Sequence, residues 1–346
     1  MKTVYFTDYS AVEQNALQSL LAFEEKEVIG RIAVFPDIHY CSERSIPVGV
    51  AFQTTEVFYP LVTGKDMGCG VAYLRIPQQQ VLRPFDKAKH YRALERAVQG
   101  MTDEGLGGGN HFLSLEASDD YLYLIVHTGS RNLGIYLYQQ NCRLLQQHNP
   151  GHDWLPLALA TPAYRQEYDR VLAYAASRRQ EFVYKTYDFL LRNKYVGAGS
   201  PVFADSCHNL LEFKHEQVIH RKGSTQLTAD SEVVIPLSMS RGSLIVKPNC
   251  WDPSVEQALW SCAHGAGRHY SRTDTLKFWH SLKKADKEAY QQRFSELLNR
   301  QGDFDSSILQ EFDFAYKDST SLLTTQPHLL RCDETQPIVT VKFTGV

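Results

Sequence analysis

The spacing of apolar residues divides the chain into helical and strand-like segments. Residues 12–25 place apolar side chains three and four positions apart, which is the spacing of one face of a helix. A helix is also predicted at 84–101, where a proline occupies a tolerated first-turn position, and another at 163–193, a stretch without glycine or proline. Further helices are expected at residues 255–264, 278–300 and 306–317.

Short runs rich in β-branched and aromatic residues lie between these segments and end near glycine or proline, as strands do. They predict strands at residues 29–35, 48–52, 57–62, 71–76, 121–126, 210–213, 233–235, 244–246 and 338–343. Strands and helices do not alternate as βαβ units, which favours an α+β fold over a doubly wound parallel sheet. We find no internal repeat or linker. We therefore expect one compact catalytic domain over residues 1–346, with mixed or antiparallel sheets and surrounding helices.

The composition is that of an ordinary globular protein with little net charge. Hydrophobic residues make up 43% of the 346 positions, which argues against a disordered or collagen-like chain. Lys and Arg number 36 and Asp and Glu 39, so the net charge is −3 and bulk positive charge does not hold the chain to nucleic acid, although a local basic cleft is compatible with this balance. The N-terminus becomes polar too early for a signal peptide, and no apolar run is long enough to cross a membrane. We expect a cytoplasmic protein without a membrane partner.

Thirteen histidines and seven cysteines are the unusual part of this composition. The cysteines are odd in number and include no C-x-x-C pair, so neither a disulfide framework nor a zinc ribbon is indicated. Asp66 and Cys69 lie three positions apart beside glycines. A thiolate binds soft to borderline cations, and a carboxylate suits harder ones such as Mn²⁺. A buried structural cysteine beside a turn aspartate explains the same segment without a metal.

Three other histidines stand in segments that favour ligand binding. His111 follows a Gly-rich loop at 105–109 whose backbone N–H groups can hold an anion, although a flexible turn before a strand has the same sequence. His127 ends an apolar strand and is followed by Gly-Ser-Arg, in which Arg131 can hold a phosphate. His208 is a further histidine in a segment of this kind and is followed by Asn209. Each histidine taken alone is also explained as a hydrogen-bonded structural residue.

His264 stands between small residues, with Arg268 and Arg272 four and eight positions further on. If this segment is helical, the three side chains share one face, which places a nucleophilic imidazole beside two guanidinium groups that match phosphate geometry. A helix that simply ends at Gly265 is the alternative. Hydroxyls at 236–243, with Arg241 among them, and Lys342 near the C-terminus can also hold phosphate or a purine edge.

Taken together, several of these segments resemble the RtcB family of RNA ligases. The matching segments are residues 35–39, 66–70, 107–111, 127–131, 208–209 and 264–268, and they occur in the family order. With Lys342 they span nearly the whole chain. The resemblance implies an RtcB-like fold and an enzyme that joins an RNA 3′-phosphate or 2′,3′-cyclic phosphate to a 5′-hydroxyl, using GTP and two Mn²⁺ ions.

The resemblance also implies roles for individual residues. Asp66, Cys69 and His111 would hold one Mn²⁺, while Cys69, His127 and His208 would hold the other, and His264 would be the nucleophile that becomes covalently bound to GMP. The positions implied around the nucleotide are Asn110, His111, Phe112, Leu113, Ser114, His208, Asn209, Pro236, Leu237, Ser238, Met239, Ser243, His264, Gly265, Ala266, Gly267 and Lys342. We expect RNA phosphates to be held by Arg131, Arg241, Arg268 and Arg272.

The chain departs from the family pattern in ways that bear on its role. Ser114 stands where the family usually has a glutamate that helps to bind guanine, and Glu116 follows two positions later. Several intervals between motifs are short, which is typical of a compact paralogue. The resemblance implies a role in RNA repair or tRNA splicing, with archease or a release-factor homologue as a partner. The alternatives are an Mn²⁺-dependent cyclic phosphodiesterase that acts on RNA ends without joining them and a non-catalytic protein that binds RNA ends.

Overall fold

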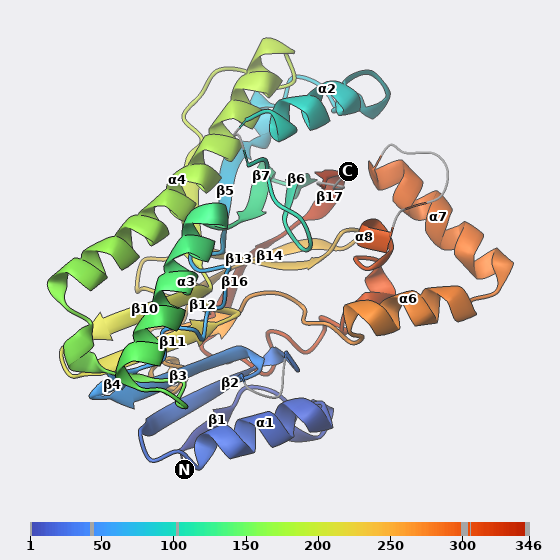
Figure 1. Cartoon of the computed structure of the whole chain (residues 1–346). Helices are drawn as coiled ribbons and strands as arrows, with labels where there is room; N and C mark the ends of the chain where they lie inside the picture. The colour runs from blue at the N-terminus through green and yellow to red at the C-terminus, as the bar shows by residue number, and fades with distance from the viewer. Residues whose placement is uncertain (1, 42–44, 102–103, 299–303, 305, 343–346) are drawn as a thin grey trace.

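A computed structural model describes residues 2–41, 45–101, 104–298, 304 and 306–342 (Figure 1). Its helices are α1 (Gln14–Glu24), α2 (Lys87–Gln99), α3 (Arg131–His148), α4 (Pro162–Arg192), α5 (Ser254–Gln257), α6 (Arg272–Ser281), α7 (Lys284–Leu298) and α8 (Ser306–Leu309). None of the helices in the described residues combines the length and the apolar character that crossing a bilayer requires.

Two five-stranded sheets form the body of the molecule. The first has the order β1 (Thr3–Tyr5), β2 (Ile29–His39), β3 (Val48–Thr55), β11 (Gln217–Lys222) and β10 (Asn209–Lys214). The second has the order β17 (Gln336–Val341), β6 (Phe112–Ala117), β7 (Tyr121–Thr128), β5 (Gly70–Pro77) and β9 (Val202–Cys207).

Smaller sheets complete the fold. One joins β13 (Val233–Ser238), β14 (Gly242–Pro248) and β16 (Leu329–Glu334), and two pairs join β12 (Ser224–Gln226) to β15 (Ser261–Ala263) and β4 (Val57–Phe58) to β8 (Leu155–Pro156). In the described part of the chain, β1 and β2 pair in parallel and the other strand pairs are antiparallel. This confirms the α+β class with mixed and antiparallel sheets.

The second sheet separates an apolar layer from a polar one. Along β6, Leu113 and Leu115 pack in a hydrophobic cluster with side chains of α2 and α4, which cover this face of the sheet (Figure 1). Ser114 and Glu116 therefore lie on the opposite face, because successive side chains of a strand alternate. That face packs toward β13 and β14 through a smaller cluster that contains Tyr123. The strand pattern thus turns polar side chains of β6 toward the space between two sheets.

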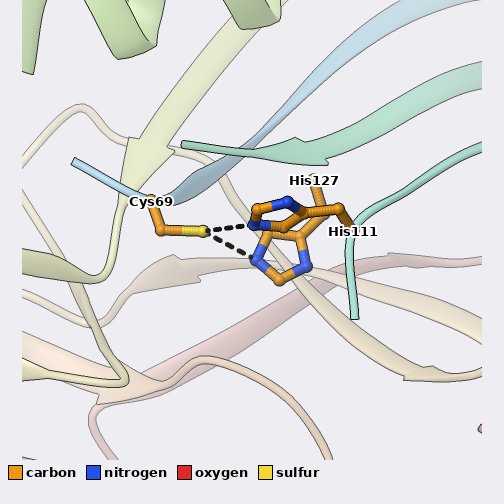
Figure 2. Close-up of side chains that lie close together, drawn as sticks. All are labelled: Cys69, His111 and His127. Carbon is orange, nitrogen blue, oxygen red and sulfur yellow. Dashed lines mark hydrogen bonds between the residues drawn. The ribbon is translucent and has the colours of Figure 1, made fainter. Parts of the chain in front are cut away.

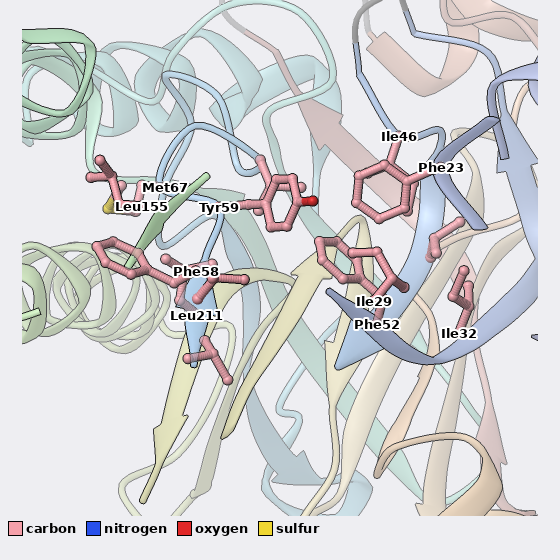
Figure 3. Close-up of a cluster of buried hydrophobic side chains, with 14 of the residues drawn as sticks. Phe23, Ile29, Ile32, Ile46, Phe52, Phe58, Tyr59, Met67, Leu155 and Leu211 are labelled. Atoms are coloured by element: carbon pink, nitrogen blue, oxygen red, sulfur yellow. The ribbon is translucent and has the colours of Figure 1, made fainter. Parts of the chain in front are cut away.

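A second core lies beneath α1 (Figure 3). Phe23 of this helix packs edge-on against Phe52 of β3, with ring centroids 4.8 Å apart. The His220 ring stacks on the Phe52 ring with a centroid distance of 4.4 Å. The Nε2 atom of His220 accepts the backbone N–H of Tyr59 at 2.9 Å. An imidazole nitrogen that accepts a hydrogen bond carries no proton, so His220 is neutral in the folded protein.

Buried neutral histidines predict a loss of stability in acid. Burial lowers the pKa of His220 to about 3 and that of His328 to about 4, below the ordinary value of 6.5. The unfolded chain therefore binds more protons below pH 6.5, and the free energy of unfolding should fall by about 1.4 kcal/mol per pH unit for each histidine as the pH drops toward 4. Urea unfolding at pH 7.5 and pH 5 measures this slope. Equal unfolding free energies at the two pH values would contradict it.

Most predicted elements are confirmed, although β6, β9 and β11 in the middle of the chain were not predicted as strands. The helices predicted at 12–25, 84–101 and 163–193 correspond to α1, α2 and α4, whereas α3 was not predicted. The strand predicted at 57–62 ends at Phe58, two residues before a proline. The last strand, predicted at 338–343, is β17 and ends at Val341, and residue 343 lies outside the described residues.

The helix predicted at 255–264 is wrong. Its start is the short α5, after which Leu259 and Trp260 adopt positive φ angles of 53° and 48°, and the chain enters β15. The helix predicted at 278–300 is two helices, α6 and α7, which separate after Ser281, and residues 299–300 lie outside the described part. The helix predicted at 306–317 is α8 followed by a single turn of 3₁₀ helix at Asp313–Ala315.

Candidate active site

A thiol, a carboxylate and three imidazoles meet at one end of the second sheet, and Figure 2 shows three of these residues, Cys69, His111 and His127. The Sγ atom of Cys69 lies 3.4 Å from His111 Nε2 and 3.1 Å from His127 Nε2. His127 Nε2 lies 3.3 Å from His208 Nε2, and His111 Nε2 lies 3.4 Å from Asp66 Oδ2. All five residues predicted as metal ligands are therefore contiguous, with Cys69 between the two halves of the group.

Strand register explains how residues so far apart in the sequence meet. Cys69 immediately precedes β5, which pairs with β7 on one side and β9 on the other. Gly70 lies opposite Thr128, beside His127, and also opposite Cys207, beside His208. His111 immediately precedes β6, whose first residue lies opposite His127. The ligand group thus forms where adjacent antiparallel strands begin and end together.

The protonation states of these groups suit metal binding. The Nδ1 atom of His127 lies 3.1 Å from the carbonyl oxygen of Asn110, which can only accept, so Nδ1 donates and the lone pair is on Nε2, toward Cys69. Burial lowers the pKa values of His127 and His208 well below the ordinary range, which keeps both imidazoles neutral. Burial would raise the pKa of Asp66, but its hydrogen bond and charge interaction with His111 hold that pKa below its usual range.

The donor set fits a divalent transition metal. Burial raises the pKa of the Cys69 thiol well above its usual value, and the Asp66 carboxylate adds to this effect. A bound cation reverses that effect, because a coordinating thiol is deprotonated. Imidazole and thiolate suit borderline metals, whereas the carboxylate suits harder ones. The group thus offers ligands that favour metals at both ends of this range.

Two consecutive arginines of α4 anchor the loops that carry these ligands. The buried guanidinium of Arg179 donates to the carbonyl oxygens of Gly68 at 2.7 Å and of Thr128 at 3.1 Å, and it pairs with Asp205. Arg178 donates to the carbonyl oxygen of Gly105 at 2.6 Å, in the Gly-rich loop. Neither residue was predicted as part of the site, because in the sequence both stand in a polar run that is typical of an exposed helix face.

The predicted nucleophile, His264, is held by Asp37. This aspartate lies in the segment 35–39 that resembles the family, but no role was predicted for it. Asp37 Oδ2 accepts the backbone N–H of His264 at 2.8 Å and lies 2.5 Å from His264 Nδ1. Asp37 is fully buried, and the His264 ring lies 4.9 Å from the His208 ring, centroid to centroid. Because Nδ1 is engaged with the carboxylate, Nε2 is the nitrogen left for reaction.

A cavity of about 1680 Å³ joins His264 to the ligand group. Single-ligand pockets are usually about 300–1,000 Å³, so this one has room for more than a nucleotide. The predicted site residues on its wall are Asp66, Asn110, Phe112, His127, His208, Asn209, Pro236, Leu237, Ser238, Met239, Ser243, His264, Gly265, Ala266, Gly267, Arg268, Arg272 and Lys342. The side chain of Leu113 instead packs in the apolar layer with α2 and α4. Ser114 is buried behind the wall.

The predicted helical face of His264, Arg268 and Arg272 does not exist, because the chain is irregular between β15 and α6. The two arginines line the cavity and pair with the buried carboxylate of Glu311, which was not predicted as a site residue. Glu311 Oε1 lies 3.5 Å from Arg268 Nη1 and 3.0 Å from Arg272 Nη1, and its Oε2 lies 3.5 Å from Lys342 Nζ. One carboxylate against three cations leaves surplus positive charge at this wall.

The other two predicted arginines are placed differently. Arg241 pairs with Asp318 at 3.3 Å on the surface and is half-exposed. Arg131 begins α3 and lies against the Gly-rich loop, where a Cβ at Gly107 would stand 3.0 Å from its Nη1. Neither residue is among the described residues on the cavity wall. The cleft therefore has two of its four predicted arginines.

Comparison with known proteins identifies the family of this chain. The family model of the tRNA-splicing ligase RtcB matches residues 84–343. The chain belongs to the RtcB family. The RNA-splicing ligase RtcB2 of Escherichia coli is 28% identical over 379 aligned positions, which cover 96% of this chain and 93% of that protein. RtcB1 of the same organism is 24% identical, covering 92% and 91%, and the tRNA-splicing ligase RtcB of Nanoarchaeum equitans is 26% identical, covering 62% and 53%. The RtcB match contains His264, whereas Asp66 and Cys69 precede it.

Replacing Cys69 by serine should weaken metal binding at least tenfold, because a hydroxyl does not supply the thiolate at the centre of the ligand group. Isothermal titration with Mn²⁺ and Zn²⁺ measures the change. Since the thiol pKa is raised by burial, metal binding to the wild-type protein should also release a proton and become tighter as pH rises. Cys250→Ser, at an exposed thiol, is the control. Equal affinities in the two variants would show that Cys69 is not a ligand.

Proposed function

We propose that this protein is a GTP- and Mn²⁺-dependent RNA ligase that joins a 3′-phosphate or 2′,3′-cyclic phosphate end to a 5′-hydroxyl end. The observation that carries the proposal is the position of His264. Its Nδ1 is held by Asp37, its ring lies beside His208 of the ligand group, and it opens on a cavity lined with cations. A structural histidine needs neither a buried carboxylate nor a metal-ligand group beside it. The names of the RNA-splicing ligases to which the chain is similar agree with this chemistry.

In the first step, His264 Nε2 attacks the α-phosphorus of GTP. A bond forms between nitrogen and phosphorus, the bond to the leaving pyrophosphate breaks, and GMP stays on the imidazole. The ring becomes positively charged as it attacks, and the Asp37 carboxylate at Nδ1 stabilises that charge. A divalent metal held by the ligand group, when bound, would neutralise phosphate charge.

The cations of the cavity wall supply the second requirement, which is neutralisation of a polyanion. Arg268, Arg272 and Lys342 are oriented by Glu311 before any ligand arrives, and preorganised charge costs little reorganisation during reaction. Arg272 also lies 3.3 Å from the position of a Cβ at Gly109, so the Gly-rich loop and this guanidinium face the same space. We assign this wall to phosphates of nucleotide and RNA.

The later steps follow the family scheme. A cyclic phosphate is opened by water to a 3′-phosphate, that phosphate displaces His264 and takes the GMP, and the 5′-hydroxyl then attacks the activated phosphate and releases GMP. We place this reaction in cytoplasmic RNA repair or tRNA splicing, where archease or a release-factor homologue would be the protein partner.

The test is incubation of the protein with Mn²⁺ and GTP labelled at the α-phosphate. We expect a covalent label that mass spectrometry locates on His264, and a chelator should prevent it. RNA with a cyclic phosphate and a 5′-hydroxyl should then be joined. Absence of label in the metal-loaded protein would contradict the proposal. Formation of 3′-phosphate ends without a nucleotide would instead favour the cyclic phosphodiesterase, the alternative suggested by Ser114.

A further inference from the structure

A second buried carboxylate faces the cavity away from the metal ligands. Glu116 is 3% exposed, lies on the polar face of β6 and forms part of the cavity wall. Ser114, two residues before it on the same face, donates its hydroxyl to Glu116 Oε1 at 2.6 Å, and the Thr335 hydroxyl binds Oε2. The small serine leaves room for the glutamate, and the two hydroxyls fix the plane of its carboxylate. Each oxygen keeps a lone pair for a further donor.

The neighbouring strand supplies the rest of this wall. Thr340 of β17 lies directly opposite Ser114 in register, and Lys342 follows two residues later on the same face. Both residues line the cavity and are almost fully buried. The Thr340 hydroxyl has no hydrogen-bond partner among the described residues. A buried polar atom without a partner is costly unless a ligand satisfies it, so this recess has the chemistry of a polar binding subsite.

We propose that Glu116, positioned by Ser114, reads the guanine base of the nucleotide, with Lys342 as its counterpart. Guanine presents two N–H donors, at N1 and at the 2-amino group, beside the O6 acceptor. A carboxylate accepts from the donors and an ammonium donates to O6. Adenine presents an acceptor at N1 and donors at N6, which reverses the pattern and leaves buried charges unpaired.

This assignment rests on the proposed function and explains why Ser114 at a position usually held by glutamate does not remove guanine recognition. The carboxylate comes from two residues further along the strand. A purely structural Glu116, which would only tie β6 to Thr335, explains the hydrogen bonds equally well. The two roles differ in one property, because a structural tie cannot discriminate between bases.

Nucleotide binding measured without the covalent step provides the test. We would titrate the His264→Ala protein with GTP, inosine triphosphate and ATP in the presence of Mn²⁺. GTP should bind roughly tenfold tighter than inosine triphosphate, which lacks the 2-amino donor, and tighter still than ATP. Equal binding of GTP and inosine triphosphate would overturn the assignment, and this comparison requires no change to the subsite.

Substitution then locates the effect. Glu116→Gln in the same background should weaken GTP roughly tenfold and leave ATP unchanged, so that the preference shrinks. Glu288→Gln, on the exposed face of α7, is the matched control. Equal weakening of all three nucleotides would show a structural role. If base-selective binding is present but wild type takes up no label, the ligation proposal fails and the subsite stands; if label forms without base preference, only the subsite fails.

Discussion

The His264→Ala protein is expected to fold, to bind Mn²⁺ with wild-type affinity and to take up no covalent nucleotide. The imidazole lines the cavity and is held at Nδ1 by Asp37, and alanine offers no nucleophile in its place. The side chain is not among the closely spaced donor atoms of Cys69, His111 and His127, so metal binding should be retained. Gel autoradiography after incubation with labelled GTP, beside isothermal titration with Mn²⁺, measures both properties.

His148→Ala is the matched control, because this histidine is exposed at the end of α3 and is not among the described residues that line the cavity. It should take up label at the wild-type rate. Persistent label in His264→Ala would place the nucleophile elsewhere. Loss of Mn²⁺ binding in His264→Ala would show that His264 is a metal ligand and that Asp37 orients a ligand instead of a nucleophile.

The sequence predicts only part of the strand arrangement around the predicted metal ligands, because β6 and β9, which adjoin His111 and His208, were not predicted as strands. His127 closes an apolar run, and Cys69 immediately precedes another. Antiparallel pairing of such runs brings their ends together. Family resemblance then supplied the roles of individual residues, and the structure places the five predicted ligands in contact.

The residues that hold the predicted site residues in place could not be predicted, because their contacts join segments that are distant in the sequence. Asp37 reaches His264 across 227 positions, and the period of apolar residues carries no information on such a pair. The helix expected around His264 failed for a local reason. The backbone of Leu259 and Trp260 lies in the left-handed region, which residues other than glycine rarely adopt. The chain then forms β15, which pairs with β12. Tertiary pairing here overrides a helical pattern.

The burial of Glu311 was also not predicted, for a different reason. Its segment was predicted as one helix over 306–317, in which a glutamate would be a solvated surface residue. The chain instead turns after α8, and an aromatic cluster that includes Phe294 and Phe312, stacked 3.9 Å apart, buries this corner. Burial would raise the pKa of Glu311, but Lys342, Arg272 and Arg268 hold it below the usual range, so the carboxylate stays charged. A buried ion group of this kind is visible only once the fold is known.

Asp37→Asn is expected to slow covalent labelling by about 10²–10⁴-fold while leaving GTP binding unchanged. Asparagine has nearly the same size, and its oxygen can still accept the backbone N–H of His264, so the local fold should survive. The negative charge beside Nδ1 is lost, however, and with it the stabilisation of the cationic imidazole that forms during attack. Single-turnover labelling at saturating GTP isolates this step from binding.

The control for this variant is Asp230→Asn, at an exposed turn position, which should label at the wild-type rate. A wild-type rate in Asp37→Asn would show that the buried carboxylate only supports the loop. A lower GTP affinity with an unchanged labelling rate would point to a displaced cavity wall. A slow rate with unchanged affinity places the effect in the transition state, where the charge of Asp37 acts, because only an interaction that is stronger there than in the bound state changes the rate of the chemical step.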